Sequence, residues 1–109
     1  MKIEFDKVER NGMIAVLVSP GFGAGWSTWA GEELTNFAAM DSGLVAMAER
    51  DAPVSEVEEY IKKKTGDEYF YTGGWPVAVE WIPTGSAFRI DEYDGSETLI
   101  SDDERTMLA

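Results

Sequence analysis

Glycine and tryptophan are concentrated in one segment of the sequence, Gly21–Trp29, which follows the apolar run Met13–Val18. Glycine lets a backbone approach a ligand closely, and tryptophan offers a flat apolar face with one N–H donor. Backbone N–H groups in such a loop can surround an anion. The candidate ligand-binding residues of this segment are Gly21, Phe22, Gly23, Gly25, Trp26, Ser27, Thr28 and Trp29. The structural alternative is a tight loop whose tryptophans close one end of a sheet.

Arg89 is a second feature with binding chemistry, because it is the only basic residue between Lys64 and Arg105. Its guanidinium could hold a phosphate or a carboxylate through two parallel hydrogen bonds. The alternative is an internal ion pair with Asp91 or Glu80. Both interpretations place a cation on a strand of a chain that is otherwise strongly acidic.

Two further aromatic residues complete the candidate ligand-binding set. Trp75 follows a pair of glycines, and Tyr93 precedes a turn. Stacking of a base on such a ring is worth about 1–3 kcal/mol. We expect Trp26 and Arg89 to border one cavity together with residues 73–75.

Catalytic chemistry is poorly represented in this sequence, which contains no cysteine and no histidine. A thiol nucleophile, a disulfide and a zinc site with cysteine or histidine ligands are therefore excluded. The usual general base at neutral pH is also missing. The spacing of the carboxylates supports neither an acid–base pair nor a serine-centred triad. We expect a non-enzymatic protein with no catalytic residue, no metal site and no cofactor.

Two carboxylates face each other in the expected C-terminal hairpin. A two-residue turn at Asp94-Gly95 places Glu92 opposite Glu97, on the same face as the apolar Phe88 and Leu99. Opposed like charges destabilise a sheet. The pair therefore needs compensation, and the open alternatives are a lysine, a metal ion bound with Asp94, a ligand amine, or exposure at the hairpin tip.

The sequence predicts strands on both sides of a helical middle. Strands are expected over residues 2–8, 13–18, 77–82, 86–93 and 96–101, with turns at Asn11-Gly12 and Asp94-Gly95. Helices are expected over residues 32–40, over residues 41–50 with Asp41 as cap, and from a Ser55–Glu58 capping box to Gly66. Residues 102–109 are expected to form a frayed tail. This order predicts one α+β domain over residues 1–109. Its sheet is expected to be mostly antiparallel and five-stranded, with two N-terminal and three C-terminal strands. Two or three helices are expected to pack on one face of this sheet.

The chain carries a formal net charge of −12. A field of this sign repels nucleic acid and anionic membranes, so direct binding to either is not expected. It favours a basic protein partner, and it is also compatible with mimicry of a nucleic-acid surface. No apolar leader follows Met1, and no apolar run has the length of a membrane span. We expect a soluble cytoplasmic protein, and the sequence does not choose between a monomer and a homo-oligomer.

Three stretches of the sequence carry a family resemblance: residues 18–29, residues 79–85 and residues 88–97. They read Val-Ser-Pro-Gly-Phe-Gly-Ala-Gly-Trp-Ser-Thr-Trp, Val-Glu-Trp-Ile-Pro-Thr-Gly and Phe-Arg-Ile-Asp-Glu-Tyr-Asp-Gly-Ser-Glu. The chain resembles, over nearly its whole length, a family of small, mostly uncharacterised proteins carried by bacteriophages. The resemblance implies a phage accessory protein that acts against a defence system in the cytoplasm of the host cell.

Two functional hypotheses follow from these observations. The first is a protein that binds and sequesters a small anionic, nucleotide-like ligand, with the glycine loop and Arg89 on its phosphate and the aromatic residues on its base. The second is an acidic protein–protein inhibitor or DNA mimic that blocks a basic host defence protein. The net charge opposes the first hypothesis unless the pocket is locally positive.

Overall fold

The computed structural model of this protein describes residues 3–101 and 107–109. The strands are β1 (Glu9–Arg10), β2 (Met13–Val18), β3 (Ala78–Pro83), β4 (Ala87–Tyr93), β5 (Ser96–Ser101) and β6 (Met107–Leu108). The helices are the short η1 (Ser27–Trp29), α1 (Thr35–Met40), α2 (Ser42–Glu49) and α3 (Val54–Thr65). None of the helices in these ranges is both long enough and apolar enough to cross a membrane.

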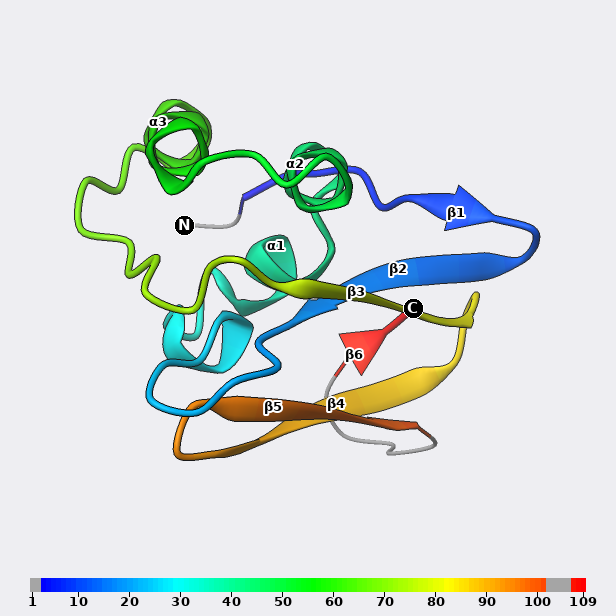
Figure 1. The fold of residues 1–109 in the computed structure, drawn as a ribbon. Helices are drawn as coiled ribbons and strands as arrows, with labels where there is room; N and C mark the ends of the chain where they lie inside the picture. The colour runs from blue at the N-terminus through cyan, green and yellow to red at the C-terminus, as the bar shows by residue number, and fades with distance from the viewer. Residues whose placement is uncertain (1–2, 102–106) are drawn as a thin grey trace.

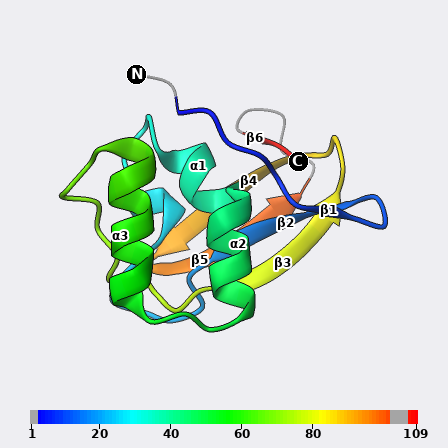
Figure 2. The same ribbon diagram turned by 90° about the horizontal axis from the view of Figure 1, so that it is seen from above.

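The strands form two antiparallel sheets, with the orders β1-β2-β3 and β5-β4-β6. Helices α2 and α3 lie on one side of the first sheet, and the second sheet lies on its other side (Figure 1). Seen from above, α2 and α3 run side by side across the strands (Figure 2). The α+β class is thus confirmed. The single five-stranded sheet is wrong, because the C-terminal hairpin forms a separate sheet with β6. The apolar side chains of this second sheet pack against Val16 and Val18 of β2.

Strand β2 is buried on both faces, as its unbroken apolar run predicts. Ala15 and Leu17 face the layer of α2 and α3. Val16 and Val18 face the second sheet, where they pack in one cluster with Phe88. One strand therefore contributes to two cores, and it leads directly into the glycine-rich segment.

Both expected hairpin turns are confirmed by their backbone angles. Asn11 and Gly12 have φ values of 53° and 76°, and Asp94 and Gly95 have values of 50° and 88°. Positive φ at both central residues is typical of the type I′ turn, whose twist matches that of the strands. The second turn aligns Glu92 with Glu97, as expected.

The helix boundaries agree with the expectations at two of the caps. Asp41 caps α2 by accepting a hydrogen bond from the Leu44 N–H at 3.1 Å. Gly66 ends α3 in the left-handed conformation with φ of 77°. The Ser55–Glu58 capping box is wrong, because α3 begins one residue before Ser55, with Pro53 at its N-cap.

The two ends of the chain differ from the predictions. Residues 3–8 form no strand, although Phe5 packs edge-on against Phe37 at 6.1 Å between ring centroids. At the other end, Met107–Leu108 pairs with β4 and Ala109 is buried, so these residues are not a frayed tail. Met107 and Ala109 are buried in the apolar cluster between the two sheets, and this burial holds the C-terminal residues in place. Residues 1–2 and 102–106 lie outside the described residues, so the predictions for them are not addressed.

Candidate functional site

The glycine-rich segment is organised around the buried carboxylate of Glu97, which is 5% exposed. One carboxylate oxygen accepts the Ser19 N–H at 2.8 Å. The other accepts the Trp26 N–H at 2.7 Å, the Thr28 N–H at 3.0 Å and the Thr28 hydroxyl at 2.5 Å. A carboxylate with this number of donors is well stabilised inside a protein. Glu97 therefore joins β5 to the segment that leaves β2.

This arrangement resolves the like-charge pair of the C-terminal hairpin. Glu97 is turned inward and compensated by backbone N–H groups, which were not among the expected partners. Glu92 remains exposed and accepts the N–H of Gly95 within its own turn at 2.7 Å. The loop does surround an anion, as its composition suggested, but that anion is the protein's own carboxylate. The N–H groups of Trp26 and Thr28 are consequently not available for an external phosphate.

The tip of the glycine-rich segment rests on the turn of the C-terminal hairpin. The Gly23 N–H donates to the Asp94 carbonyl at 2.5 Å, and the Glu97 N–H donates to the Ser19 carbonyl at 2.9 Å. Gly95 lies so close to the Ala24 backbone that a Cβ atom at this position would overlap it. A glycine is thus required here by both its positive φ and its contact. The loop and the hairpin tip form one structural unit.

Trp26 belongs to the core, with an exposed fraction of 0%. Its indole N–H donates to the Ala38 carbonyl at 2.7 Å, and its ring contacts Phe70 and Trp75, each at 5.4 Å between centroids. It therefore cannot stack on a ligand, and the expectation that Trp26 and Arg89 border one cavity is wrong. Trp26 instead follows the structural alternative: it closes the end of the sheet and donates its indole N–H to a carbonyl.

Trp29 and Trp75 have different environments. Trp29 is 40% exposed and stacks on Tyr71 at 5.5 Å between centroids, with an interplanar angle of 30°. Trp75 is half-buried, and its indole N–H donates to the Ala52 carbonyl at 2.9 Å. Of the candidate tryptophans, only Trp29 presents a substantial face to solvent.

Phe22 and Tyr93 lie together on the outer face of the hairpin tip. Phe22 is 71% exposed and Tyr93 is 78% exposed. They line a shallow hollow of about 480 Å³. We call this surface the aromatic–acidic face; its residues are Phe22, Asp91, Glu92, Tyr93, Ser96 and Thr98. Large exposed aromatic side chains beside carboxylates are a feature that stability alone does not require.

Arg89 borders a separate cavity of about 390 Å³ near the start of η1. Its Nε donates to Asp91 Oδ1 at 2.6 Å and its Nη2 donates to Asp91 Oδ2 at 3.2 Å. The expected internal pair with Asp91 is therefore present. The residues lining this cavity, here called the Ser27 cavity, are Ser27, Thr28, Glu32, Thr35, Asn36, Arg89, Ile90 and Met107.

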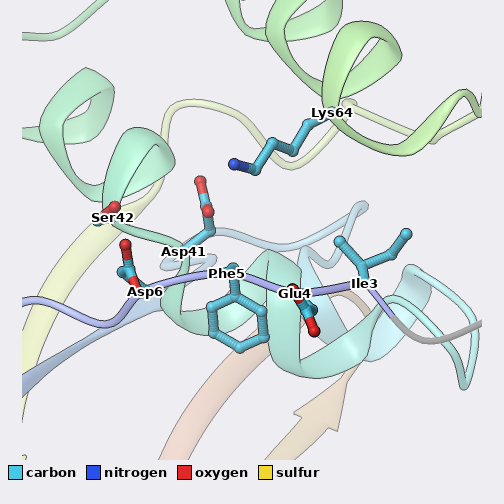
Figure 3. A pocket seen from close by; sticks show the side chains of 7 residues that line it. All are labelled: Ile3, Glu4, Phe5, Asp6, Asp41, Ser42 and Lys64. Atoms are coloured by element: carbon cyan, nitrogen blue, oxygen red, sulfur yellow. The ribbon is translucent and has the colours of Figure 1, made fainter.

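Another hollow, of about 690 Å³, lies between the N-terminal segment and α3. Asp41 and Lys64 point toward each other across it, and Glu4 and Asp6 lie along the N-terminal segment (Figure 3). Asp41 is 1% exposed and accepts the Tyr60 hydroxyl at 2.6 Å. Burial, followed by this hydrogen bond, raises the pKa of Tyr60 above its ordinary range. Because Asp41 also caps α2, its role here is structural.

The candidate ligand-binding residues thus lie in separate places. Trp26 and Trp75 share the core, and Phe22 shares a hollow with Tyr93. Thr28 and Arg89 line the Ser27 cavity. The exposed Gly21 and Gly23 shape the loop, whereas the buried Gly25 packs under the Trp29 ring. Within residues 3–101 and 107–109, no group of three or more carboxylates is arranged to hold a metal ion.

Comparison of the chain with protein-family models, with curated proteins and with solved structures gave no match in any of the three.

Proposed function

We propose that this protein is a non-enzymatic, acidic binding protein that attaches through its aromatic–acidic face to a basic surface of another protein. The observation that carries the proposal is the exposure of Phe22 and Tyr93, at 71% and 78%, in one hollow. Aromatic side chains that fill pockets on a partner supply much of the binding energy of protein interfaces. The resemblance to phage accessory proteins suggests a host defence protein as the partner.

The rigidity of this face supports the same proposal. Phe22 is held between the strand β2 and the hairpin turn by the Gly23–Asp94 hydrogen bond and by the Glu97 carboxylate. A preorganised surface loses little conformational entropy on binding, which favours affinity. The backbone segments that carry the two aromatic side chains are therefore held together.

Charge defines the chemistry of the partner. The protein has a formal net charge of −12. Glu92 lies beside the two aromatic side chains, and so does Asp91, which is paired with Arg89. A field of this sign accelerates the approach of a basic surface and weakens with added salt. A surface that normally binds nucleic acid has the required charge, so the proposal includes inhibition by imitation of DNA.

Sequestration of an anionic nucleotide has less support. The Glu97 carboxylate holds the loop N–H groups of Trp26 and Thr28 that such a ligand would use. The Arg89 guanidinium already pairs with Asp91. The nucleotide hypothesis stays a prediction, and it requires donors other than these.

Affinity capture from lysate of the bacterial host, at low and at moderate salt, tests the proposal. We expect a stoichiometric basic protein at low salt and much less of it at moderate salt. The double variant Phe22→Ser/Tyr93→Ser should lose this partner while its thermal stability is retained, because both side chains are largely exposed.

A matched control is Tyr69→Ser, which removes an aromatic ring that is 90% exposed and lies outside the aromatic–acidic face. This variant should capture the partner as the wild type does. Capture that persists in the double variant would contradict the proposal, and so would capture that is insensitive to salt. A nucleotide that co-purifies in place of a protein would favour the sequestration hypothesis.

A further inference from the structure

Strand β3 has an outer edge, here called the β3 edge, with which no strand pairs in the described part of the chain. Figure 2 shows β3 as the outermost strand on its side of the first sheet, at the end of the order β1-β2-β3. The other edges offer less to a partner. Strands β1 and β6 have two residues each, and at the edge of β5 the Glu97 N–H already donates to the Ser19 carbonyl. We therefore consider what the β3 edge can bind.

The register between β2 and β3 determines which backbone groups point to the β3 edge. The Thr84 N–H donates to the Gly12 carbonyl across this ladder, and bonded pairs alternate with unbonded pairs along antiparallel strands. Counted from this pair, Glu80 is bonded to β2, whereas its neighbours Val79 and Trp81 direct their N–H and C=O groups outward. Within residues 3–101 and 107–109, these outward groups have no hydrogen-bond partner.

Outward backbone groups of this kind favour the addition of a strand. A row of N–H and C=O groups without partners is a template on which another chain can pair. The side chains of Val79 and Trp81 pack on the layer of α2 and α3 and remain partly accessible, and Glu80 between them is exposed. An added strand would extend the first sheet by one member and would give the outward groups of both residues their partners.

The carboxylate of Glu80 selects the kind of strand that can pair here. It has no ion pair among the described residues, whereas Arg10, which lies over the Trp81 ring, is paired with Glu49. The residue opposite Glu80 on an added antiparallel strand belongs to an unbonded pair, in which side chains approach most closely. An opposite charge stabilises such a pair and a like charge destabilises it. A second copy that used all the outward groups would place two Glu80 side chains opposite each other, so self-pairing is disfavoured.

From these observations we infer that the β3 edge binds an extended basic segment of another protein as an added antiparallel strand, with a lysine or an arginine opposite Glu80. The formal net charge of −12 favours the approach of such a segment. The inference goes beyond the proposed function, because the β3 edge shares no residue with the aromatic–acidic face. It can therefore hold where the proposed function fails.

Amide hydrogen exchange of the free ¹⁵N-labelled protein tests first whether the edge is open. The amides of Val79 and Trp81 should exchange about tenfold or more faster than those of Glu80 and Ile82, which are bonded to β2. This alternation should be the same at low and at high protein concentration. Absence of the alternation would overturn the inference. Protection of Val79 and Trp81 that grows with concentration would also overturn it, because a second copy would then occupy the edge.

A capped peptide with the sequence threonine–valine–lysine–valine–threonine is the probe for the added strand. At millimolar concentration it should shift the amide signals of Val79 and Trp81 and slow their exchange. N-methylation of both valines removes the N–H groups that would donate to the carbonyls of these two residues, so it should abolish binding. N-methylation of the lysine, whose N–H points away from β3, is the matched control and should leave binding in place. No binding of the unmethylated peptide, or binding that survives methylation of the valines, would refute strand addition.

Charge reversal at Glu80 tests the choice of partner. Glu80→Lys, at an exposed position, should bind the lysine peptide about threefold to tenfold more weakly than the wild type does. It should prefer the corresponding peptide with glutamate at the central position. Glu59→Lys, which makes the same charge change at an exposed position of α3, is the matched control and should bind as the wild type does. An unchanged peptide preference in Glu80→Lys would contradict the pairing of a basic residue with Glu80.

Discussion

Truncation of Glu97 to alanine should destabilise the protein far more than truncation of Glu92, although the two residues are directly paired across the hairpin. Glu97→Ala removes the acceptor of the backbone N–H groups of Ser19, Trp26 and Thr28. Each buried donor without a partner costs about 1–3 kcal/mol. Water entering the vacated space will hydrate part of them, so we expect a loss of about 3–5 kcal/mol.

Urea denaturation followed by tryptophan fluorescence measures this loss, with Glu92→Ala as the matched control. Glu92 is exposed and accepts one hydrogen bond, from the Gly95 N–H, so its truncation should cost about 0.5–1.5 kcal/mol. Glu97→Gln should cause an intermediate loss of stability, because the glutamine amide oxygen still accepts a hydrogen bond on one side while its NH₂ group faces a donor on the other. Equal losses for Glu97→Ala and Glu92→Ala would refute the reasoning.

Three further predictions concern the core and the titrating groups. Trp26→Ala should lower the free energy of unfolding by about 3–5 kcal/mol in urea denaturation, and a loss below about 1 kcal/mol would contradict its burial. Because the pKa of Tyr60 is raised by burial and by its hydrogen bond to Asp41, stability should be full below the pKa of an unfolded tyrosine and decline as the pH rises above it. Tyr60→Phe should abolish this alkaline decline in the denaturation midpoint. The hydrogen bond from Arg10 lowers the pKa of Glu49, so this pair stabilises the fold above the pKa of an unfolded glutamate and the contribution disappears as the pH falls through the lowered value. Carboxyl NMR titration of Arg10→Ala should show the pKa of Glu49 returning toward its ordinary value.

Local features of the fold were predictable from the sequence. The turns at Asn11-Gly12 and Asp94-Gly95, the cap at Asp41 and the stop at Gly66 depend on residues adjacent in the chain. The burial of β2 on both faces also followed from its apolar run. These elements have short-range chemical causes that a single sequence contains.

The stacking of two sheets was not predictable, because it depends on which strand edges are already occupied. Nothing in the residues of β4 shows that β3 holds the edge of β2 that β4 would otherwise use. The short strand Met107–Leu108 pairs with β4 across the chain and has no local signal. Pairing choices of this kind are set by the competition among distant segments.

The site was predictable in part. The paired glutamates and the donor-rich loop were both recognised from the sequence, yet their contact joins residues that are 78 and 71 positions apart. Trp26 was misplaced because composition does not distinguish a tryptophan that closes a core from one that lines a pocket. The buried Ser27 hydroxyl has no hydrogen-bond partner among the described residues, and the sequence gives no signal of this.

The apolar character of both faces of β2 has a consequence for how its register is chosen. In an ordinary strand, a shift by one residue would bury polar side chains, and this penalty fixes the alignment. In β2 the same shift would exchange Ala15 and Leu17 for Val16 and its neighbours without burying any charge. Hydropathy therefore does not select the alignment, and side-chain volume together with the pairing to β3 must select it. A slip of one residue against β3 would leave a hydrophobic strand that delivers side chains of the wrong volume to both cores.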